Sequence, residues 1–314
     1  MTDFYDLFGG GAAVSLEMLK HEKVKTHYNE LNTPIYELLK YLVENKNLDP
    51  KFYEWVSRED FKKVIETDKP DWYSGLLMTC WSFGNSQKGY MYGSKIEKDK
   101  NLAHHTIVEN CELSAEILGF KDFHLFEGKD LRQRRLIFSS FFKNKNTRFE
   151  IENLERIQNL ERIQNLERIQ NLELNNKSYE NIEIKGFNPV LYCDIPYKDA
   201  EGYQKRAKLK NINNYDEIET KVITNIRFKS DGTPYQFARR YPIKGQSSKP
   251  AFDYDKFYNW FANLPFPAYM SEYDAPFEEV ANFKHRSSLS ATNNNKSTAE
   301  KIFWNGKELL KDLY

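Results

Sequence analysis

Residues 188–197 read Asn-Pro-Val-Leu-Tyr-Cys-Asp-Ile-Pro-Tyr, and the rest of the chain is organised around them. The segment from Val190 to Cys193 is apolar, β-branched and aromatic, too short for a helix and bounded by prolines, which predicts a buried strand. Asp194 follows at the carboxyl end of this strand, the end beyond which open α/β sheets bind ligands. We therefore expect chemistry at Asp194, although Asp-x-Pro-Tyr after a strand is also an ordinary strand-to-turn exit.

The start of the chain has the pattern of a nucleotide-binding unit. Residues 4–8 predict a strand, residues 9–11 a triple-glycine turn, and residues 12–20 a helix. Strand, glycine turn and helix open a mononucleotide-binding βαβ unit, in which glycines let the backbone approach a ligand closely. Residues 24–28 predict the second strand, and Glu30 stands 19 residues after the last of these glycines. An acidic residue about 20 residues after such a loop binds a ribose; the alternative for Glu30 is an exposed acid at a strand end.

Three motifs, in this order along the chain, carry a resemblance to a known family. They are Asp6-Leu7-Phe8-Gly9-Gly10-Gly11, then Tyr28-Asn29-Glu30-Leu31-Asn32, then Asp194-Ile195-Pro196-Tyr197. Together they resemble the Dam-type family of adenine-N6 DNA methyltransferases, and the resemblance covers most of the chain. It implies S-adenosylmethionine as the cofactor, with these binding residues: Asp6, Phe8, Gly9, Gly10, Gly11 and Glu30. The glycine loop would cradle its methionine portion, and Glu30 would hold its ribose hydroxyls.

The resemblance also implies the catalytic residues Asp194, Ile195, Pro196 and Tyr197. The exocyclic amine of a base is a poor nucleophile because its lone pair is delocalised into the ring. A carboxylate from Asp194 and the backbone carbonyl of Ile195 would accept its N–H bonds, make the nitrogen more tetrahedral and free the lone pair. Pro196 would shape the turn, and Tyr197 would stack on a base flipped out of the duplex. Ile195 stands where the family usually has proline, and it presents the same carbonyl.

The expected fold class is α/β, a Rossmann-like S-adenosylmethionine-dependent methyltransferase sheet with an inserted DNA-recognition region and a short hexapeptide-repeat segment. Residues 1–66 and 174–314 are expected to form the catalytic core, with an insertion at residues 198–250. Residues 67–152 are expected to form the target-recognition region, and residues 153–173 a repeat spacer.

The target-recognition region begins with an unusual mixture of residues. Residues 71–93 combine aromatic residues with glycines and small polar residues, which indicates a functional loop near the flipped base and DNA. The alternative is an aromatic corner of the core. Helices are expected at residues 33–45, 52–66 and 102–118. The expected DNA-binding residues come from this loop and from a basic segment further on: Phe83, Asn85, Lys88, Arg132, Arg134 and Arg135.

Residues 153–170 consist of three copies of Asn-Leu-Glu-Arg-Ile-Gln. Their apolar residues fall at every third position, a spacing that winds around an α-helix because each step of three lags by about 60°. We therefore expect a short solenoid-like stack that acts as a structural spacer. A helix is the alternative, because the composition favours helix formation.

The segment after the catalytic motif interrupts the pattern expected of the family. Residues 198–250 interleave basic and aromatic residues, which suggests a DNA-contacting lobe. The alternative is an ordinary solvated surface, because acidic residues are mixed among them. Asp231-Gly232 predicts a hairpin turn. Beyond the insertion, residues 253–264 predict a helix and residues 268–273 a strand.

Composition limits the possible partners. Lys plus Arg and Asp plus Glu both number 46, so the net charge is zero and contacts to nucleic acid must come from local patches. Cys80, Cys111 and Cys193 lie in apolar runs and are interpreted as reduced core thiols, not as a disulfide or zinc framework. We expect no metal site, no signal peptide and no run of the about 18 apolar residues that a membrane span needs. The expected protein is a cytoplasmic monomer or dimer of a bacterial or phage-infected cell.

The predicted function is transfer of a methyl group from S-adenosylmethionine to the N6 amine of adenine in double-stranded DNA by base flipping. A cytosine-N4 or RNA amino-methyltransferase would share every motif described above. A release-factor glutamine methyltransferase is a further alternative, although such enzymes prefer asparagine at the position of Asp194. From a different class, the alternative is a non-catalytic DNA-binding relative.

Overall fold

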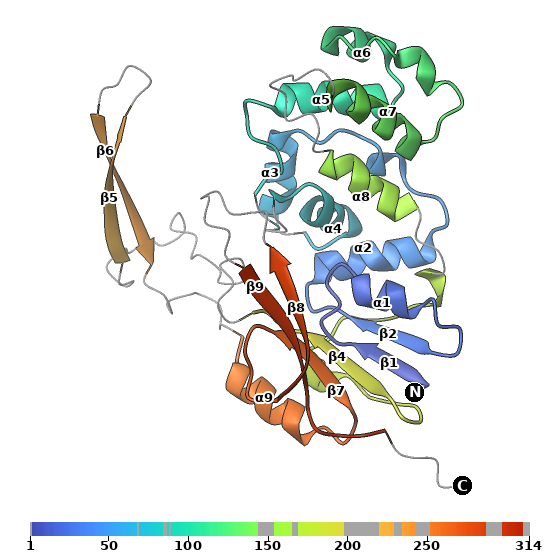
Figure 1. Cartoon of the computed structure of the whole chain (residues 1–314), viewed down its shortest axis with the longest axis vertical. Helices are drawn as coiled ribbons and strands as arrows, with labels where there is room; N and C mark the ends of the chain where they lie inside the picture. The colour runs from blue at the N-terminus through green and yellow to red at the C-terminus, as the bar shows by residue number, and fades with distance from the viewer. Residues whose placement is uncertain are drawn as a thin grey trace. The chain divides into compact units, whose positions relative to one another are not determined.

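The computed structural model describes residues 2–67, 69–83, 87, 89–143, 154–164, 169–197, 220–228, 234–242, 252–286 and 297–309. The chain forms two compact units. The first combines Met1–Asp194 with Pro265–Tyr314, and the second is Ile195–Leu264. The elements of both units are labelled in Figure 1.

The first unit is built on a seven-stranded sheet with the order β3-β2-β1-β4-β7-β9-β8. Its strands are β1 (Asp3–Asp6), β2 (Lys25–Asn29), β3 (Glu173–Asn175), β4 (Val190–Asp194), β7 (Ala268–Glu272), β8 (Glu278–Arg286) and β9 (Ser297–Trp304). The first five pair in parallel, and β9 runs antiparallel between β7 and β8. Together with the helices described below, this confirms the expected Rossmann-like α/β class.

The central strands β1 and β4 contribute buried residues to the core, as central strands of a parallel sheet do. All four residues of β1 are buried, and Leu191 and Cys193 of β4 are fully buried. The apolar runs that predicted strands at the start of the chain and at Val190–Cys193 therefore reflect burial in the middle of a sheet.

The order of the strands reverses between β1 and β4. The chain steps outward from β1 to β2 and β3, and then returns to place β4 on the other side of β1. The parallel register pairs Phe4 with Val190 and Asp6 with Tyr192. Open α/β sheets bind ligands at such a reversal, beyond the carboxyl ends of the strands. The ends of β1 and β4 are therefore the place to look for a site.

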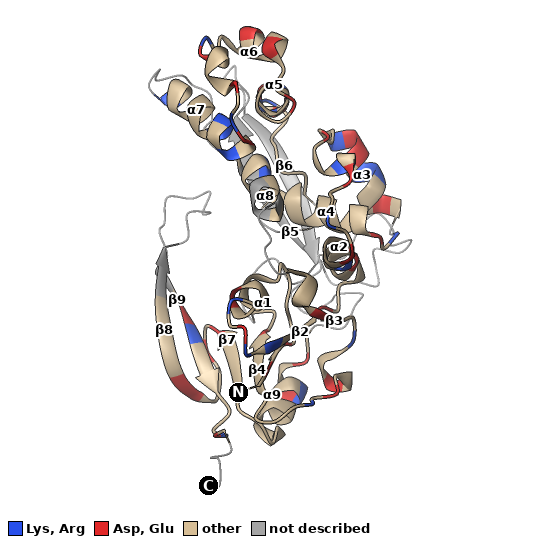
Figure 2. Cartoon of the chain, turned by 90° about the vertical axis from the view of Figure 1, so that its right-hand side faces the viewer, with Lys and Arg blue, Asp and Glu red and all other residues tan. Residues whose placement is uncertain are grey.

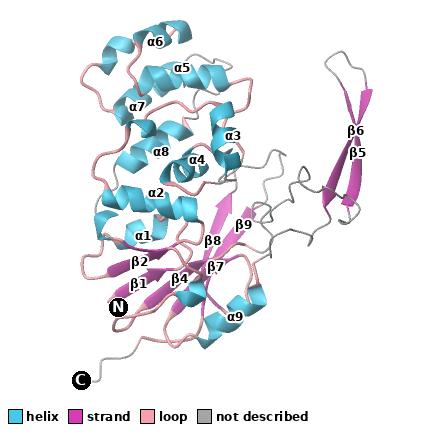
Figure 3. Ribbon diagram, turned by 180° about the vertical axis from the view of Figure 1, so that it is seen from behind, coloured by secondary structure: helices cyan, strands magenta, loops and turns pink. Residues whose placement is uncertain are grey.

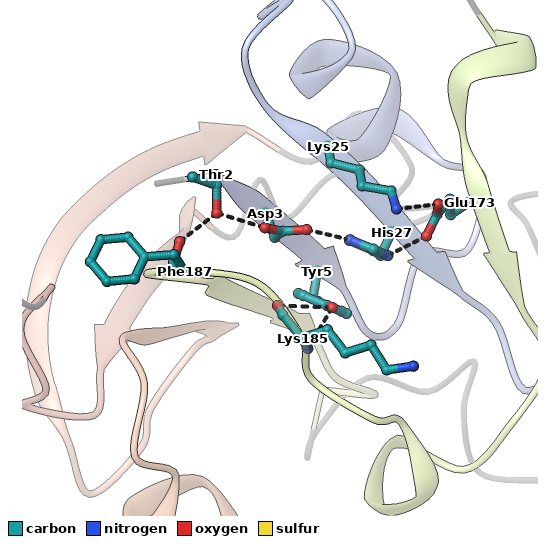
Figure 4. A network of polar contacts seen from close by, with 8 residues as sticks. All are labelled: Thr2, Asp3, Tyr5, Lys25, His27, Glu173, Lys185 and Phe187. Carbon is teal, nitrogen blue, oxygen red and sulfur yellow. Dashed lines mark hydrogen bonds and ion pairs between the residues drawn. The ribbon is translucent and has the colours of Figure 1, made fainter.

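A polar network joins the opposite, amino ends of β1, β2 and β3 (Figure 4). The two ring nitrogens of His27 each lie 2.9 Å from a carboxylate oxygen, one of Asp3 and one of Glu173. Burial alone would raise the pKa of Asp3, but hydrogen bonds from Thr2 and His27 together hold that pKa below its ordinary value. Tyr5 stacks on His27 with ring centroids 4.1 Å apart. The network fixes the three strands far from the ligand-binding edge.

Between β2 and β3 the chain forms a lobe of helices. They are α2 (Thr33–Glu44), α3 (Arg58–Thr67), α4 (Trp72–Cys80), α5 (Glu97–Ile107), α6 (Glu112–Leu118), α7 (Leu131–Lys143) and α8 (Glu155–Gln164), preceded by α1 (Ala13–Met18) after β1. Figures 1 and 3 show the lobe extending away from the sheet, with α2 nearest to the strands and α6 farthest. Its core is aromatic: Tyr41, Phe52 and Trp72 stack on one another.

The structure corrects three expectations in this lobe. Residues 71–93 do not form one loop, because Asp71 and Ser74 make a capping box that starts α4. The helix expected at residues 102–118 is two helices, divided at Asn110, whose φ of 56° is left-handed. The helix expected at residues 52–66 begins only at Arg58, after a 3₁₀ turn at Pro50–Phe52.

The first two copies of the repeat form the helix α8, which contradicts the expected solenoid-like stack for these residues and agrees with the helix alternative; residues 165–168 of the third copy lie outside the described residues. Three apolar residues of the first two copies are buried: Leu154, directly before α8, and Ile157 and Leu160 within it. Three residues at a spacing of three sweep only about 120° of a helix surface, which is still one face. In a longer helix the same spacing would carry the apolar residues around to the solvent-exposed side. The helix α8 ends at Gln164, and a 3₁₀ turn follows at Ile169–Asn171.

Arg156 in α8 is a buried cation. It is 1% exposed, donates to the carbonyl oxygen of Phe52 and lies over the ring of Trp81, 4.9 Å from the ring centroid. Burial lowers the pKa of this guanidinium. Among the described residues, its Nε and Nη1 find no hydrogen-bond partner. The contacts with Phe52 and Trp81 tie the repeat to the aromatic core of the lobe.

The second unit contains a β-hairpin and a helix. The strands β5 (Thr220–Phe228) and β6 (Pro234–Pro242) pair antiparallel, and the predicted turn at Asp231-Gly232 lies outside the described residues. The helix α9 (Tyr254–Asn263) confirms the helix predicted at 253–264, with Asp253 accepting from the backbone N–H of Lys256 at 3.0 Å. No helix in the part of the chain that the structure describes is long and apolar enough to cross a membrane.

Close packing of α4 on α2 depends on Gly75. A Cβ at this position would lie 2.0 Å from the carbonyl oxygen of Pro34 and 2.9 Å from the Cβ of Leu38. We predict that Gly75→Ala lowers the free energy of unfolding by about 1–3 kcal/mol, because overpacking outweighs the gain in helix propensity. Urea denaturation measures the change. Gly93→Ala is the matched control, because its Cβ would meet nothing within 4 Å; equal stability of the two variants would contradict the prediction.

Candidate active site

Asp6 ends β1 at the point where the strand order reverses. Its carboxylate is 2% exposed, and Oδ2 accepts a hydrogen bond of 2.7 Å from the hydroxyl of Ser15 in α1. Oδ1 is buried and has no hydrogen-bond partner among the described residues. The pKa of Asp6 is raised to about 7, chiefly by burial and in part by the nearby charges of Asp194 and Glu30, while the hydrogen bond from Ser15 acts in the opposite direction. Asp6 is therefore a buried carboxyl with one unused oxygen.

The glycine loop is held against the end of β2. A Cβ on Gly9 would lie 2.2 Å from the ring of Tyr28, so only glycine fits there. The backbone N–H of Gly9 donates to the carbonyl of Asn29 at 2.8 Å, and the Tyr28 hydroxyl donates to the carbonyl of Gly10 at 2.7 Å. Gly10 and Gly11, by contrast, have no atom within 4 Å of their Cβ positions. The loop is pinned on one side and open on the other.

Glu30 connects this loop to the segment after β2. Its carboxylate accepts from the backbone N–H of Gly10 at 2.9 Å and of Asn32 at 2.6 Å. Burial raises the pKa of Glu30, and the backbone N–H bonds act in the opposite direction. Each oxygen keeps a second lone pair, so the fixed carboxylate can still accept hydrogen bonds from a ligand.

Asn29 holds the ends of the strands together, a role that sequence reasoning missed. Its amide donates to the carbonyls of Leu7 at 2.9 Å and Lys177 at 3.0 Å, and its oxygen accepts from the N–H of Lys177 at 3.0 Å. Ser15 was missed as well. The sequence did contain a signal for the role of Asn29: a polar residue at the last position of a buried strand, directly before Glu30, indicates a side chain that bonds to backbone at the strand end.

Asp194 ends β4 and is exposed, unlike Asp6. The parallel register places it beside Ser271 of β7, whose buried hydroxyl donates to its Oδ1 at 2.7 Å. Cys193 before it is fully buried, and burial raises the pKa of its thiol well above the ordinary value. A protonated, buried thiol is a poor nucleophile, which is consistent with Cys193 being a core residue.

The rest of the motif belongs to the second unit, which begins at Ile195. Within it, Ile195 is buried, Pro196 and Tyr197 are half-buried, and the hydroxyl of Tyr254 donates to the carbonyl oxygen of Pro196 at 2.6 Å. The turn after Asp194 is therefore held by a residue of α9. Among described residues, no group of three or more His, Cys, Asp or Glu side chains is arranged to hold a metal ion.

The predicted DNA-binding residues fall in two separate places. Phe83 is 57% exposed in the segment after α4, where Gln87 accepts a hydrogen bond of 2.9 Å from Asn32, close to Glu30. Asn85 and Lys88 lie outside the described residues.

The predicted arginines, Arg132, Arg134 and Arg135, lie on α7. Figure 2 shows α7 in the part of the helical lobe away from the sheet. Arg132 is exposed, whereas Arg134 is half-buried and its pKa is lowered by that burial. The structure does not bring these arginines to the edge where Asp6 and Asp194 lie.

The fold and site together define a class of protein. The sheet is mostly parallel, and a glycine loop lies where the strand order reverses. Carboxylates follow β1, β2 and β4 at the same edge. This combination is typical of Rossmann-like enzymes that bind a nucleotide cofactor. The chain belongs to the D12 class N6 adenine-specific DNA methyltransferase family, which it matches over residues 1–273. The resemblance stated from its motifs is thus confirmed, and the family methylates adenine in DNA. No curated protein matches the chain.

The raised pKa of Asp6 predicts a pH dependence of stability. Asp6 titrates near 3.8 in an unfolded chain and about 7 in the folded protein, so the folded state binds more protons between these values. The free energy of unfolding therefore falls as pH rises through this window, by at most about 1.4 kcal/mol per pH unit from this group. Asp6→Asn cannot ionise, so its stability relative to the wild type should rise from pH 4 to pH 7 and then level off.

Urea denaturation at pH 4 to 8 measures this difference. Asp60→Asn on α3 is the matched control, because it makes the same substitution at an exposed carboxylate. Parallel stability curves for Asp6→Asn and the wild type would show that Asp6 titrates normally.

Proposed function

We propose that the protein transfers a methyl group from S-adenosylmethionine to the N6 amine of adenine in duplex DNA, with the target base flipped out of the helix. The observation that carries this proposal is the placement of Asp6, Glu30 and Asp194 at one edge of the sheet in a member of a DNA adenine methyltransferase family. A cytosine-N4 or RNA acceptor is disfavoured by the same membership.

The residues at this edge fit the cofactor. Its methionine portion carries an ammonium group, and the unused Oδ1 of Asp6 is an acceptor for it. The open side of Gly10 and Gly11 leaves room for close approach of the ligand to the backbone. The fixed carboxylate of Glu30 suits two ribose hydroxyls. Leu31, which is apolar and 68% exposed beside Glu30, offers a surface for the adenine ring.

When bound, the cofactor supplies an electrophilic methyl group on a positively charged sulfur. Every other part of the proposed step belongs to the chain. Asp194 accepts a hydrogen bond from the target amine, and Ser271 orients its carboxylate through Oδ1. The carbonyl of Ile195 accepts the second N–H, and Tyr197 stacks on the base. The S–C bond breaks as the N–C bond forms, S-adenosylhomocysteine leaves as a neutral thioether, and the methylated nitrogen loses one proton to solvent. The rate enhancement comes from alignment of the amine and from charge stabilisation as the nitrogen becomes cationic.

The first DNA contacts that we propose come from the segment after α4. Phe83 is exposed, and the bond between Gln87 and Asn32 anchors this segment beside the proposed cofactor site. An exposed ring there can stack on a base next to the target. The α7 arginines are proposed as contacts to DNA phosphates outside the target site.

The catalytic role of Asp194 predicts the outcome of a methyl-transfer assay. We expect Asp194→Asn to reduce transfer of labelled methyl from S-adenosylmethionine to unmodified duplex DNA by about 10²-fold or more, because an amide matches the amine poorly as an acceptor. Asp60→Asn should keep wild-type activity. Label must appear on adenine N6. A wild type that binds the cofactor but labels no DNA would overturn the proposed function.

The role of Glu30 is tested without DNA. Glutamine at this position would turn an N–H₂ donor toward the backbone N–H of Gly10 or Asn32, where a carboxylate oxygen now accepts. We expect Glu30→Gln to weaken binding of S-adenosylhomocysteine at least about 10-fold by calorimetry, since a tenfold change needs only about 1.4 kcal/mol. Glu17→Gln, an exposed change on α1, should bind normally. Equal affinities would remove Glu30 from the site.

A further inference from the structure

The β-hairpin of the second unit has a regular register. Figure 3 shows its two strands, β5 and β6, as a ribbon. The strands of nine residues each pair without a shift, from Thr220 with Pro242 to Phe228 with Pro234. In an antiparallel pair, directly opposite residues belong to the same face, and successive positions alternate between the two faces. The register therefore sorts the hairpin's residues into two sets.

The two sets differ sharply in composition. One face holds the pairs Lys221–Tyr241, Ile223–Arg239, Asn225–Phe237 and Arg227–Tyr235. The other holds Thr220–Pro242, Val222–Arg240, Thr224–Ala238, Ile226–Gln236 and Phe228–Pro234. The first, which we call the basic–aromatic face, carries three of the four basic residues and three of the four aromatic residues. Neither strand contains an acidic residue; the one acidic residue between them in the sequence is Asp231, in the connection that joins the strands.

This composition matches one kind of partner. Basic residues bind phosphates, and aromatic residues between them stack on bases or cover sugar surfaces. A two-stranded ribbon fits the major groove of duplex DNA. Nine residues at about 3.4 Å each extend for roughly 30 Å, close to one turn of the double helix. Length, shape and charge all favour a duplex over a short single strand.

We propose that the basic–aromatic face is a DNA-binding surface that engages the duplex outside the flipped adenine and contributes to sequence recognition. The proposal rests on the proposed function, because it takes the methylated duplex as the partner. In this proposal the basic residues at positions 221, 227 and 239 meet phosphates or base edges of the duplex, and the aromatic residues at positions 235, 237 and 241 belong to the same face of the ladder. The chain supports this role, since the unit that carries the hairpin begins directly after Asp194.

Neighbouring arginines provide the test. Arg239 and Arg240 are adjacent in the chain and carry the same charge, but the register places them on opposite faces. Arg239→Gln and Arg240→Gln therefore remove the same charge from almost the same place. Binding of each full-length variant to a fluorescent duplex of about 20 base pairs is measured by anisotropy at several salt concentrations.

We expect Arg239→Gln to weaken binding about 5–10-fold and to reduce the salt slope by about one, while Arg240→Gln stays within about twofold of the wild type. The triple variant Lys221→Gln, Arg227→Gln, Arg239→Gln should reduce the slope by about 2.7. For the aromatic residues, Phe237→Ala should weaken binding and Phe228→Ala on the other face should not. Circular dichroism checks that every variant remains folded.

Equal effects of Arg239→Gln and Arg240→Gln, or no effect of either, would overturn the inference. So would tighter binding of the wild type to single-stranded DNA or RNA of the same length. Methyl transfer is measured on the same variants to separate the two proposals. If the wild type methylates DNA but Arg239→Gln and Arg240→Gln bind the duplex equally well, only the proposed hairpin surface is overturned. If Arg239→Gln alone weakens DNA binding but the wild type transfers no methyl group, the surface is supported and the proposed activity is overturned.

Discussion

The parallel pairing of β1 with β4 is the interaction on which the rest of the structure depends. It joins the start of the chain to a strand almost two hundred residues later and sets the two at one register, with Asp6 opposite Tyr192. Because side chains alternate along a strand, a slip of one residue would turn every one of them to the opposite face. The same pairing creates the reversal of strand order and gives the sheet its ligand-binding edge. Asp6 and Asp194 interact because this pairing puts their strands side by side.

Carboxylates dominate that edge. Asp6, Glu30 and Asp194 stand at the ends of neighbouring or nearly neighbouring strands, and the raised pKa of Asp6 reflects burial together with the charges of the other two. Such an edge repels an anion and attracts a cation. The cofactor that we propose carries positive charge on its sulfur and its amino group, so it would relieve this repulsion. The glycine loop contributes close approach of backbone, and Tyr28 and Asn29 keep that backbone in place.

The parts of the structure predictable from sequence are those with local signals. The strand at Val190–Cys193, the helix at Thr33–Glu44 with its buried face, and the glycine loop with Glu30 all follow from short patterns. The lobe was harder, because two residues of a capping box, Asp71 and Ser74, decide where α4 begins within an aromatic-rich stretch. The roles of Asn29 and Ser271 depend on partners far along the chain, which no local pattern names. The solenoid prediction for the repeat was wrong because a short helix can keep apolar residues at every third position on one face, whereas a long helix cannot.

The boundary between the two units has a consequence for how the family can diversify. The chain leaves the sheet at Asp194 and returns to it in β7, the strand beside β4, after a whole compact unit has been inserted in the crossover. The pairing of β4 with β7 constrains only the two ends of the segment between these strands. An exchange of the intervening residues would leave the strand register, the glycine loop and Asp194 in place. It would also replace Ile195, Pro196 and Tyr197, because the boundary between the units lies directly after Asp194. Only exchanges that keep these first residues of the second unit would preserve the whole Asp194–Tyr197 motif.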